Sequence, residues 1–284
     1  MNPHSGGNRT CREAWLEGLK RSAERVILTR HAGHAAEAAA EGRDYAGVAV
    51  VGGDGTLFEV LKGMDRERQR IALFPAGRGN ALGRDLGLMG PRGVEEVLHW
   101  RPQPRIDLLE VRATFADGRQ SASLAASTVA LGYAVMIARR AQGLRWMGAM
   151  SYAAAAAFMR PHRSSMWVEY GGESGRELWL SGLIANNTHH IANFHGYPEA
   201  HCADGVFEVM EMDGGMPRQT AHNLSALSGT GIYQPYPLRQ TTAARVHLKT
   251  PQDLMLDGEI FPCAVDVEIR LLPAALACNR PRAH

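Results

Sequence analysis

Apolar residues recur along this chain with two different periods, and the change falls near residue 105. Before that point, helical patterns alternate with short apolar runs, which is typical of an α/β domain with a parallel sheet. The predicted strands there are residues 26–29, 48–51 and 71–74. The predicted helices are residues 12–23, 34–41, 57–64, 80–86 and 94–100.

From residue 105 onwards, apolar and polar residues mostly alternate, which predicts an antiparallel sandwich with one or two helices. The predicted strands are residues 105–115, 121–130, 166–170, 177–186, 206–212, 244–249 and 264–271. The predicted helices are residues 135–159 and 217–227. We therefore predict two domains: an α/β domain at residues 1–104 and a β-rich domain at residues 105–284.

The composition is that of a globular protein. Of 284 residues, 45% are hydrophobic and 21% charged, which provides enough apolar surface for two cores. The net charge of +2 gives no general attraction to nucleic acid, so we expect no such partner. The four cysteines have no metal-binding or paired spacing, which predicts reduced thiols and a cytoplasmic location.

The longest uncharged run of the chain does not predict a membrane span. Residues 120–138 carry no charge, but they alternate like a buried strand that enters a helix at Gly132. Met1 leads directly into a polar loop, whereas an α/β domain is expected to open with a hydrophobic strand. We therefore expect a first strand to precede Met1 in the natural protein.

The strongest chemical signal is Gly52-Gly53-Asp54-Gly55-Thr56, between a buried strand and a helix. Glycines let a ligand approach the backbone, and helix N-termini attract anions, so this loop predicts phosphate binding. A carboxylate beside phosphates fits Mg²⁺-linked phosphoryl transfer, or a base near an acceptor hydroxyl. The structural alternative is a plain strand-to-helix turn in which Asp54 caps the helix.

A second glycine loop follows the next predicted strand and contains Gly77, Arg78, Gly79 and Asn80. Loops after adjacent parallel strands lie side by side, so both loops are expected to line one cleft. Arg78 would bring positive charge towards phosphates. By contrast, nothing beyond the dipeptide His189-His190 indicates a histidine metal cluster, and we interpret these residues as loop histidines.

The chain resembles the diacylglycerol kinase catalytic-domain superfamily, which includes bacterial diacylglycerol kinases, sphingosine kinases and ceramide kinases. The resemblance begins with Asn2-Pro3 and Ser5-Gly6, and continues through the two glycine loops in that order and spacing. It extends along the chain through three further segments. These are Thr29 with His34-Ala35, the strand entry at Asp204-Gly205, and Asp257-Gly258-Glu259.

The resemblance implies a kinase that uses ATP and Mg²⁺. The implied nucleotide contacts are Asn2, Thr29, Gly52, Gly53, Asp54, Gly55, Thr56, Arg78, Gly79, Asn80 and Arg145, with Glu59 steadying the loop. The implied catalytic residues are Asp54, Asp257 and Glu259, and either Asp54 or Glu259 takes the proton. The implied metal positions are Asp107 and Asp204.

Two departures from the family bear on the acceptor. Ala81 follows Asn80 where bacterial diacylglycerol kinases have an aspartate, so this loop is more similar to that of sphingosine kinases. The aspartate with which sphingosine kinases recognise an amine has no counterpart after Gly132-Tyr133. An unpaired ammonium in an apolar pocket is costly, so the predicted acceptor is the hydroxyl of a neutral, diacylglycerol-like lipid.

The predicted function is thus an ATP-dependent lipid kinase of lipid metabolism and phospholipid biosynthesis. Residues 135–159 combine methionines with arginines, which suggests either transient contact with a membrane surface or ordinary core packing. Two alternatives stay open. One is NAD kinase, which shares the Gly-Gly-Asp-Gly-Thr loop; the other is a non-catalytic nucleotide sensor or lipid-binding protein of the same fold.

Overall fold

The structure, a computed structural model, describes residues 1–3, 5–6, 9–90, 92–99, 105–144, 154–155, 159–191, 194–195, 200–215, 236 and 238–279. Its helices are α1 Arg9–Ser22, α2 His34–Glu41, α3 Asp54–Gly63, α4 Ala81–Asp85, α5 Val94–His99 and α6 Tyr133–Gly143. Its strands are β1 Gly47–Gly52, β2 Arg70–Pro75, β3 Ile106–Phe115, β4 Gln120–Ala125, β5 Thr128–Gly132, β6 Ser164–Tyr170, β7 Arg176–Leu180, β8 Gly182–Asn186, β9 His190–Ile191, β10 Phe194–His195, β11 Phe207–Met212, β12 Leu238–Thr241, β13 Ala243–Leu256 and β14 Glu259–Cys278.

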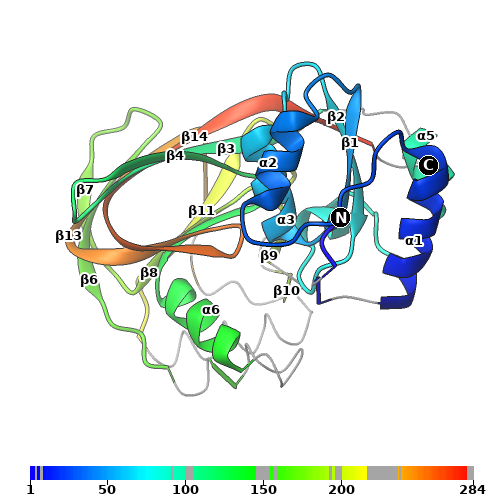
Figure 1. The fold of residues 1–284 in the computed structure, drawn as a ribbon. Coiled ribbons are helices and arrows are strands. Elements are labelled where there is room, and N and C mark those ends of the chain that lie inside the picture. Colours follow the sequence, from blue (N-terminus) through cyan, green and yellow to red (C-terminus); the bar gives the residue numbers. More distant parts are fainter. Residues whose placement is uncertain are drawn as a thin grey trace.

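The first hundred residues form a layered α/β unit. Strands β1 and β2 run parallel, and helices cover both faces (Figure 1). On one face, Val50 and Leu73 pack in a core with side chains of α2 and α3. On the other face, Val51 and Phe74 pack with α1 and α5. Strands buried on both sides need continuous apolar runs, which is what residues 48–51 and 71–74 supply.

The predicted strand at residues 26–29 was wrong. This segment has no strand assignment, although Ile27 and Thr29 bond with the backbone of Met1 at 2.8 and 2.9 Å. The next residue, Asn2, donates its amide to Val51 O at the end of β1 (2.9 Å). Met1 thus lies between residues 27–29 and β1, and one residue is too short a partner for a ladder.

The remaining strands, apart from the separate β9–β10 pair, form an antiparallel unit around a large core. The pairing order passes through β14, β13, β5, β8, β11 and β12, and further strands join β13 and β14 at their sides. The first half of β13 pairs with β6 and its second half with β5, with register shifts between His247 and Leu254. Because of these register shifts, β13 pairs with strands of both layers of the unit, and the core lies between the two layers.

Two predicted strands are each split into two shorter ones. Residues 121–130 divide into β4 and β5, and residues 177–186 divide into β7 and β8. The reason is a change of partner: β4 pairs with β3, whereas β5 pairs with β8 and β13. The helix predicted at residues 135–159 corresponds to α6, which ends at Gly143. The predicted helix at residues 217–227 lies outside the described residues.

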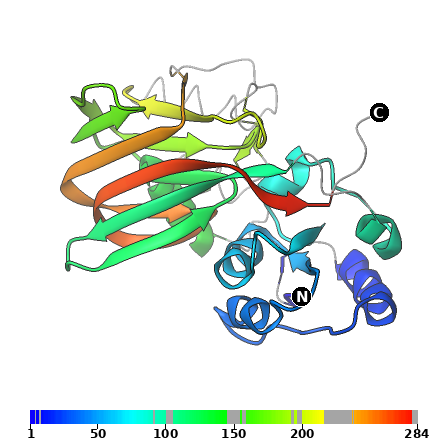
Figure 2. The same cartoon turned by 90° about the horizontal axis from the view of Figure 1, so that it is seen from above.

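The two units are joined at several places. The end of β14 crosses to the first unit, where Ala277 and Cys278 pair in parallel with β2 (Figure 2). In the other direction, Phe58 of α3 is 2% exposed and belongs to the core of the antiparallel unit. The position of the domain boundary at residue 104 stays a prediction. Among the described residues, no helix has the length and apolarity needed to cross a membrane.

Candidate active site at the meeting of two glycine loops

The loop between β1 and α3 is closed by contacts that leave no room for larger residues. A Cβ added to Gly52 would lie 2.5 Å from the side chain of Thr56. Thr56 is buried, and its Oγ1 accepts a hydrogen bond from Asn2 Nδ2 at 3.1 Å. The predicted nucleotide residues Asn2 and Thr56 therefore meet, and α3 begins at Asp54, so its N-terminus lies at this loop.

The two glycine loops touch through their backbones, which confirms their predicted adjacency. A Cβ on Gly77 would lie 2.4 Å from Gly53 Cα, and one on Gly53 would lie 2.8 Å from Gly77 Cα. The amide of Ala76 also donates to Gly52 O at 2.8 Å. Because backbone cannot move aside as a side-chain end can, both positions require glycine.

Asn80 fixes the second loop. Its side chain accepts from Gly77 N at 2.9 Å and donates to Gly77 O at 2.8 Å, while its own backbone is left-handed with φ of 55°. Asparagine tolerates this conformation better than most residues. Arg84 adds a bond from Nε to Gly79 O at 2.9 Å. The predicted binding residues Gly79 and Asn80 are thus held in place by hydrogen bonds, and the Asn80 side chain joins two ends of the loop by bonding to the backbone of Gly77.

Asp54 is half-buried at this junction, and its pKa is raised from 3.8 to about 7. The largest cause is burial, which disfavours the charged carboxylate, and the second is the nearby charge of Asp257. Backbone hydrogen bonds from Asn80 and Ala81, at the start of α4, oppose the shift. Asp54 therefore exchanges a proton near neutral pH, as a general base requires.

Asp257 reaches the site from the other unit, on the two-residue turn between β13 and β14. Both turn residues have positive φ, 48° for Asp257 and 92° for Gly258, as a type I′ hairpin requires. The carboxylate accepts four hydrogen bonds from three consecutive residues. The donors are Ala126 N at 2.6 Å, Ser127 N at 2.9 Å, Ser127 Oγ at 2.7 Å and Thr128 N at 2.8 Å. Burial nevertheless raises the pKa of Asp257 above its ordinary value.

Glu259, two residues further on, extends over the first glycine loop. A Cβ added to Gly55 would lie 2.8 Å from Glu259 Oε1. The Glu259 side chain is exposed and has no hydrogen-bond or ion-pair partner within the part of the chain that the structure describes. The three predicted catalytic residues thus gather at one place, two of them on the hairpin turn and one on the glycine turn.

The other predicted nucleotide residues lie around the same loops. Arg78 is exposed beside the N-terminal loop, since a Cβ on Gly6 would lie 2.4 Å from its Nε. Thr29 is half-buried and bonds to Met1 O. Glu59 accepts the amides of Gly33 at 2.8 Å and Ala35 at 3.2 Å, and so holds the N-terminus of α2. Arg145 lies outside the described residues.

The two predicted metal positions have different surroundings. The carboxylate of Asp107 is buried and accepts the amides of Gly205 at 2.9 Å and Ala274 at 2.7 Å, which ties three segments together. Asp204 is exposed and accepts the amide of Val206 at 3.1 Å. In the described segments, no three histidine, cysteine or acidic side chains converge as a ready metal cage. Metal binding at Asp107 and Asp204 stays a prediction.

The sequence did not single out the residues that support the two aspartates. Ala126, Ser127 and Thr128 hold Asp257, and Asn187 in turn donates to the carbonyl of Ala126 at 3.1 Å. Asp85 binds His190, a residue that we had interpreted as a loop histidine. Short polar residues in strands carry no motif of their own, so only the pairing of distant segments reveals their role.

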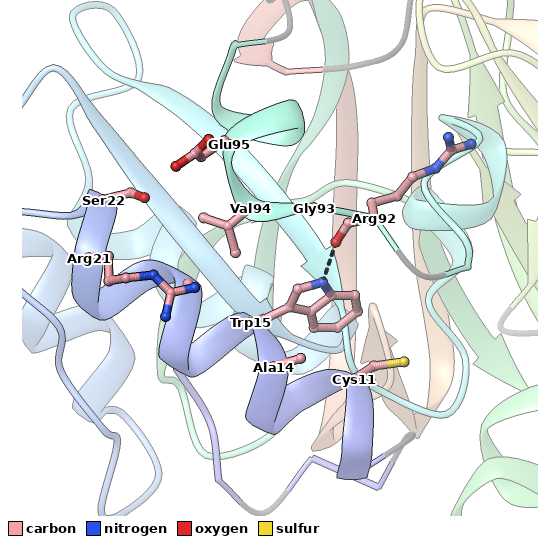
Figure 3. A pocket seen from close by; sticks show the side chains of 10 residues that line it. Cys11, Ala14, Trp15, Arg21, Ser22, Arg92, Gly93, Val94 and Glu95 are labelled. Atoms are coloured by element: carbon pink, nitrogen blue, oxygen red, sulfur yellow. Dashed lines mark hydrogen bonds between the residues drawn. The ribbon is translucent and has the colours of Figure 1, made fainter.

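A separate hollow lies on the far side of the first unit, between α1 and α5 (Figure 3). It has a volume of about 450 Å³ and is lined by Cys11, Ala14, Trp15, Gly18, Arg21, Ser22, Arg92, Gly93, Val94 and Glu95. The indole of Trp15 spans it and donates to Arg92 O at 2.9 Å. None of the predicted site residues lines this hollow, so it is not part of the site.

Part of this chain matches the sequence model of a known protein family. Residues 1–111 match the sequence model of the diacylglycerol kinase catalytic domain. Diacylglycerol kinases of two Mycobacterium tuberculosis strains, CDC 1551 / Oshkosh and ATCC 25618 / H37Rv, are each 25% identical over 255 residues. Each alignment covers 87% of this chain and 80% of the relative.

The fold is also that of a solved structure. A diacylglycerol kinase of Bacillus anthracis str. Sterne superposes with a TM-score of 0.76 over 99% of this chain and 95% of its own. At 17% sequence identity, this similarity shows a shared fold alone. It confirms the predicted architecture of an α/β unit followed by a β-rich unit.

Proposed function

We propose that the chain transfers the γ-phosphate of ATP to a lipid hydroxyl, starting from the match of residues 1–111 to the sequence model of the diacylglycerol kinase catalytic domain. Residues 1–104 bind the nucleotide and residues 105–284 bind the acceptor, with the reaction between the two units. The observation that carries the proposal is the half-buried Asp54, placed beside Asp257 where two glycine loops meet.

The nucleotide phosphates bind at the glycine loops. The amides at the start of α3 and the glycines of both loops offer donors without side chains in the way. Arg78 is exposed at the rim, where its guanidinium adds positive charge. Asn2 and Thr56, already bonded to each other, fix the position of the N-terminal loop against this surface.

The carboxylates present fit a magnesium ion bound together with the nucleotide. Mg²⁺ takes oxygen ligands and is usually held by one or two carboxylates plus substrate phosphates. Glu259, exposed over Gly55, is the carboxylate that would hold it. When bound, the ion neutralises negative charge on the phosphate oxygens.

Asp54 is the proton acceptor in this proposal. The oxygen of the acceptor hydroxyl attacks the γ-phosphorus in line, the bond from phosphorus to the β–γ bridging oxygen breaks, and ADP leaves. The hydroxyl proton passes to the Asp54 carboxylate. A pKa of about 7 supports this role, because roughly half of the molecules then hold Asp54 ionised at neutral pH.

The acceptor is a neutral lipid of the diacylglycerol kind. The antiparallel unit has an apolar cluster under α6, which includes Tyr133, Ile184 and Met210. On the outer side of α6, Met136 is 40% exposed next to Arg139 and Arg140. An exposed apolar residue flanked by arginines suits brief contact with a membrane surface.

A phosphate-transfer assay tests the proposal. The protein is incubated with γ-labelled Mg-ATP and mixed micelles of diacylglycerol, monoacylglycerol, phosphatidylglycerol, ceramide or sphingosine, with NAD as a separate acceptor. We expect label in a neutral glycerolipid. Asp54→Asn should lower transfer about 100-fold or more, whereas Asp117→Asn, in the exposed β3–β4 turn, should not.

Each of the other outcomes of this assay would contradict one specific part of the proposed function. Label in NAD alone would make the chain an NAD kinase. ATP binding without label in any acceptor would indicate a nucleotide sensor. Normal transfer by a folded Asp54→Asn variant would remove Asp54 as the proton acceptor.

A further inference from the structure

Helix α4 ends at a buried acidic residue that is held by two histidines in succession. The side chain of Asp85 is 3% exposed. Its Oδ2 accepts the backbone amide of His189 at 2.5 Å, and its Oδ1 bonds with Nδ1 of His190, whose side chain is 13% exposed. Because each carboxylate oxygen has its own partner, the carboxylate plane and the end of α4 are both fixed.

The other end of α4 holds the proposed proton acceptor. Backbone groups of Asn80 and Ala81 bond with the carboxylate of Asp54. Arg84 of α4 donates a hydrogen bond to Gly79 O, and the side chain of Asn80, just before α4, is hydrogen-bonded to the backbone of Gly77. The five residues of α4 connect these contacts to Asp85. A displacement of Asp85 would therefore displace the backbone of Asn80 and Ala81 as well.

On the far side of the pair, polar contacts lead to Asp257. The hydroxyl of Thr188 donates to His190 O at 2.8 Å, and Asn186 Nδ2 donates to Thr188 O. Thr128 Oγ1 donates to Asn186 Oδ1, and the amide of Thr128 donates to Asp257. Thr128, Asn186 and Thr188 are at most 4% exposed, so water does not substitute for these bonds easily.

We propose that Asp85 and His190 are a positioning pair for phosphate transfer, which fixes Asp54 relative to Asp257 by joining α4 to the strands that support the hairpin turn. This inference rests on the proposed function for its kinetic test. The pair acts on Asp54 through Asn80 and Ala81. A displacement of about 1 Å at a reacting group is enough to lower a rate about 100-fold.

The test compares two substitutions at one position. His190→Leu removes the Nδ1 hydrogen bond, whereas His190→Asn retains an N–H donor near the place of Nδ1. We expect His190→Leu to lower kcat between about 10- and 100-fold. The Kd for a non-hydrolysable ATP analogue should change little, because the amides of α3 are untouched. His190→Asn should restore most of kcat.

A matched control and a second variant protect this interpretation. His247→Leu breaks another histidine–aspartate contact, to Asp266 at 3.5 Å on the exposed face of β13, and should leave kcat unchanged. If His190→Leu does not fold, Asp85→Asn is measured in its place, and it should lower kcat in the same way. The double variant Asp85→Asn/His190→Asn should be no worse than the more impaired single variant, because both act on one contact.

Three results would overturn the proposal. They are an unchanged kcat in His190→Leu, a His190→Asn variant as impaired as His190→Leu, and a loss of ATP-analogue affinity that accounts for the whole effect. The second result would instead give the imidazole a direct part in proton transfer.

Amide hydrogen exchange separates this proposal from the proposed function. If the wild-type protein phosphorylates no acceptor, the proposed function fails by itself. The pair is then judged by exchange at Asn80 and Ala81, which should be faster in His190→Leu by about 10-fold or more and normal in His190→Asn. Unchanged exchange in His190→Leu would show that the pair does not position these amides.

Discussion

The glycine turn, residues 52–56, and the hairpin turn, residues 256–259, each bring one aspartate to the site, but they hold it differently. Asp257 receives four hydrogen bonds from Ala126, Ser127 and Thr128. Asp54 has backbone donors from Asn80 and Ala81, and it also faces the charge of Asp257. Burial raises the pKa of both carboxyls, so neither carboxylate is as well solvated as in water.

This difference separates an acid that is tied into the fold from the one that we propose as the proton acceptor. The four donors of Asp257 fasten the hairpin turn to the start of β5, and they favour the ionised form. Its charge then raises the pKa of Asp54, which lies within reach of the glycine loops. A carboxylate whose charge is poorly compensated destabilises the fold, and such groups gather where chemistry takes place.

The largest expected effect concerns the stability of the protein against pH. The pKa of Asp54 is raised from 3.8 to about 7 in the folded state, so the folded protein binds the extra proton between these values. The stability that this proton contributes is present below pH 4 and is lost as the pH rises through 7. The full loss is about 4 kcal/mol, from about 1.4 kcal/mol per pKa unit.

Asp54→Asn isolates that contribution. The variant should be more stable than the wild type at pH 8, by up to about 4 kcal/mol, and should match it more closely at pH 4. Urea unfolding at a series of pH values measures this, with Asp117→Asn as the exposed control. If Asp54→Asn were destabilised at pH 8, the carboxylate would be compensated by contacts stronger than its burial.

A smaller effect of opposite sign is expected at the hairpin turn. In Asp257→Asn, the amide can accept the three bonds at Oδ1, but its NH₂ group then faces the amide of Ala126. One buried donor loses its partner, which destabilises the fold by about 2 kcal/mol. Urea unfolding at pH 8 measures this, and Ser127→Ala, which removes one donor, should cost about 1 kcal/mol. A more stable Asp257→Asn variant would mean that the two aspartates are alike.

The smallest effect on stability is expected at Glu259. Its side chain is exposed, so Glu259→Gln should change the free energy of unfolding by less than about 0.5 kcal/mol. If Glu259 holds Mg²⁺, the concentration of Mg²⁺ that gives half-maximal transfer should rise about 10-fold. Titration of the transfer rate with Mg²⁺ measures this, with Glu17→Gln on α1 as the control. A loss of kcat at saturating Mg²⁺ would favour Glu259 over Asp54 as the proton acceptor.

The same two turns show what the sequence could predict. The glycine turn is local: strand, glycines and helix follow one another, so the element, its neighbour loop and Asp54 were predictable from pattern and resemblance. The supports of Asp257 lie 129 to 131 residues away, and Asp85 and His190 lie 105 residues apart. Contacts at such separation depend on which strands pair, and no spacing in the sequence reveals it. For the same reason, the change of partner at Ser127 split a strand that the alternation predicted to be continuous.

The return of β14 to the first unit also sets an order of events during synthesis. Residues 47–75 leave the ribosome early and supply β1 and β2, but the neighbour of β2 is Ala277–Cys278, about 200 residues later. Asn279 then bonds to Ile71 O at 2.7 Å, so the edge of β2 is exposed until nearly the whole chain has emerged. Long-range pairing of this kind is slow to form, and an unpaired edge is open to wrong partners. The α/β unit, although first in the chain, is thus among the last parts to be completed.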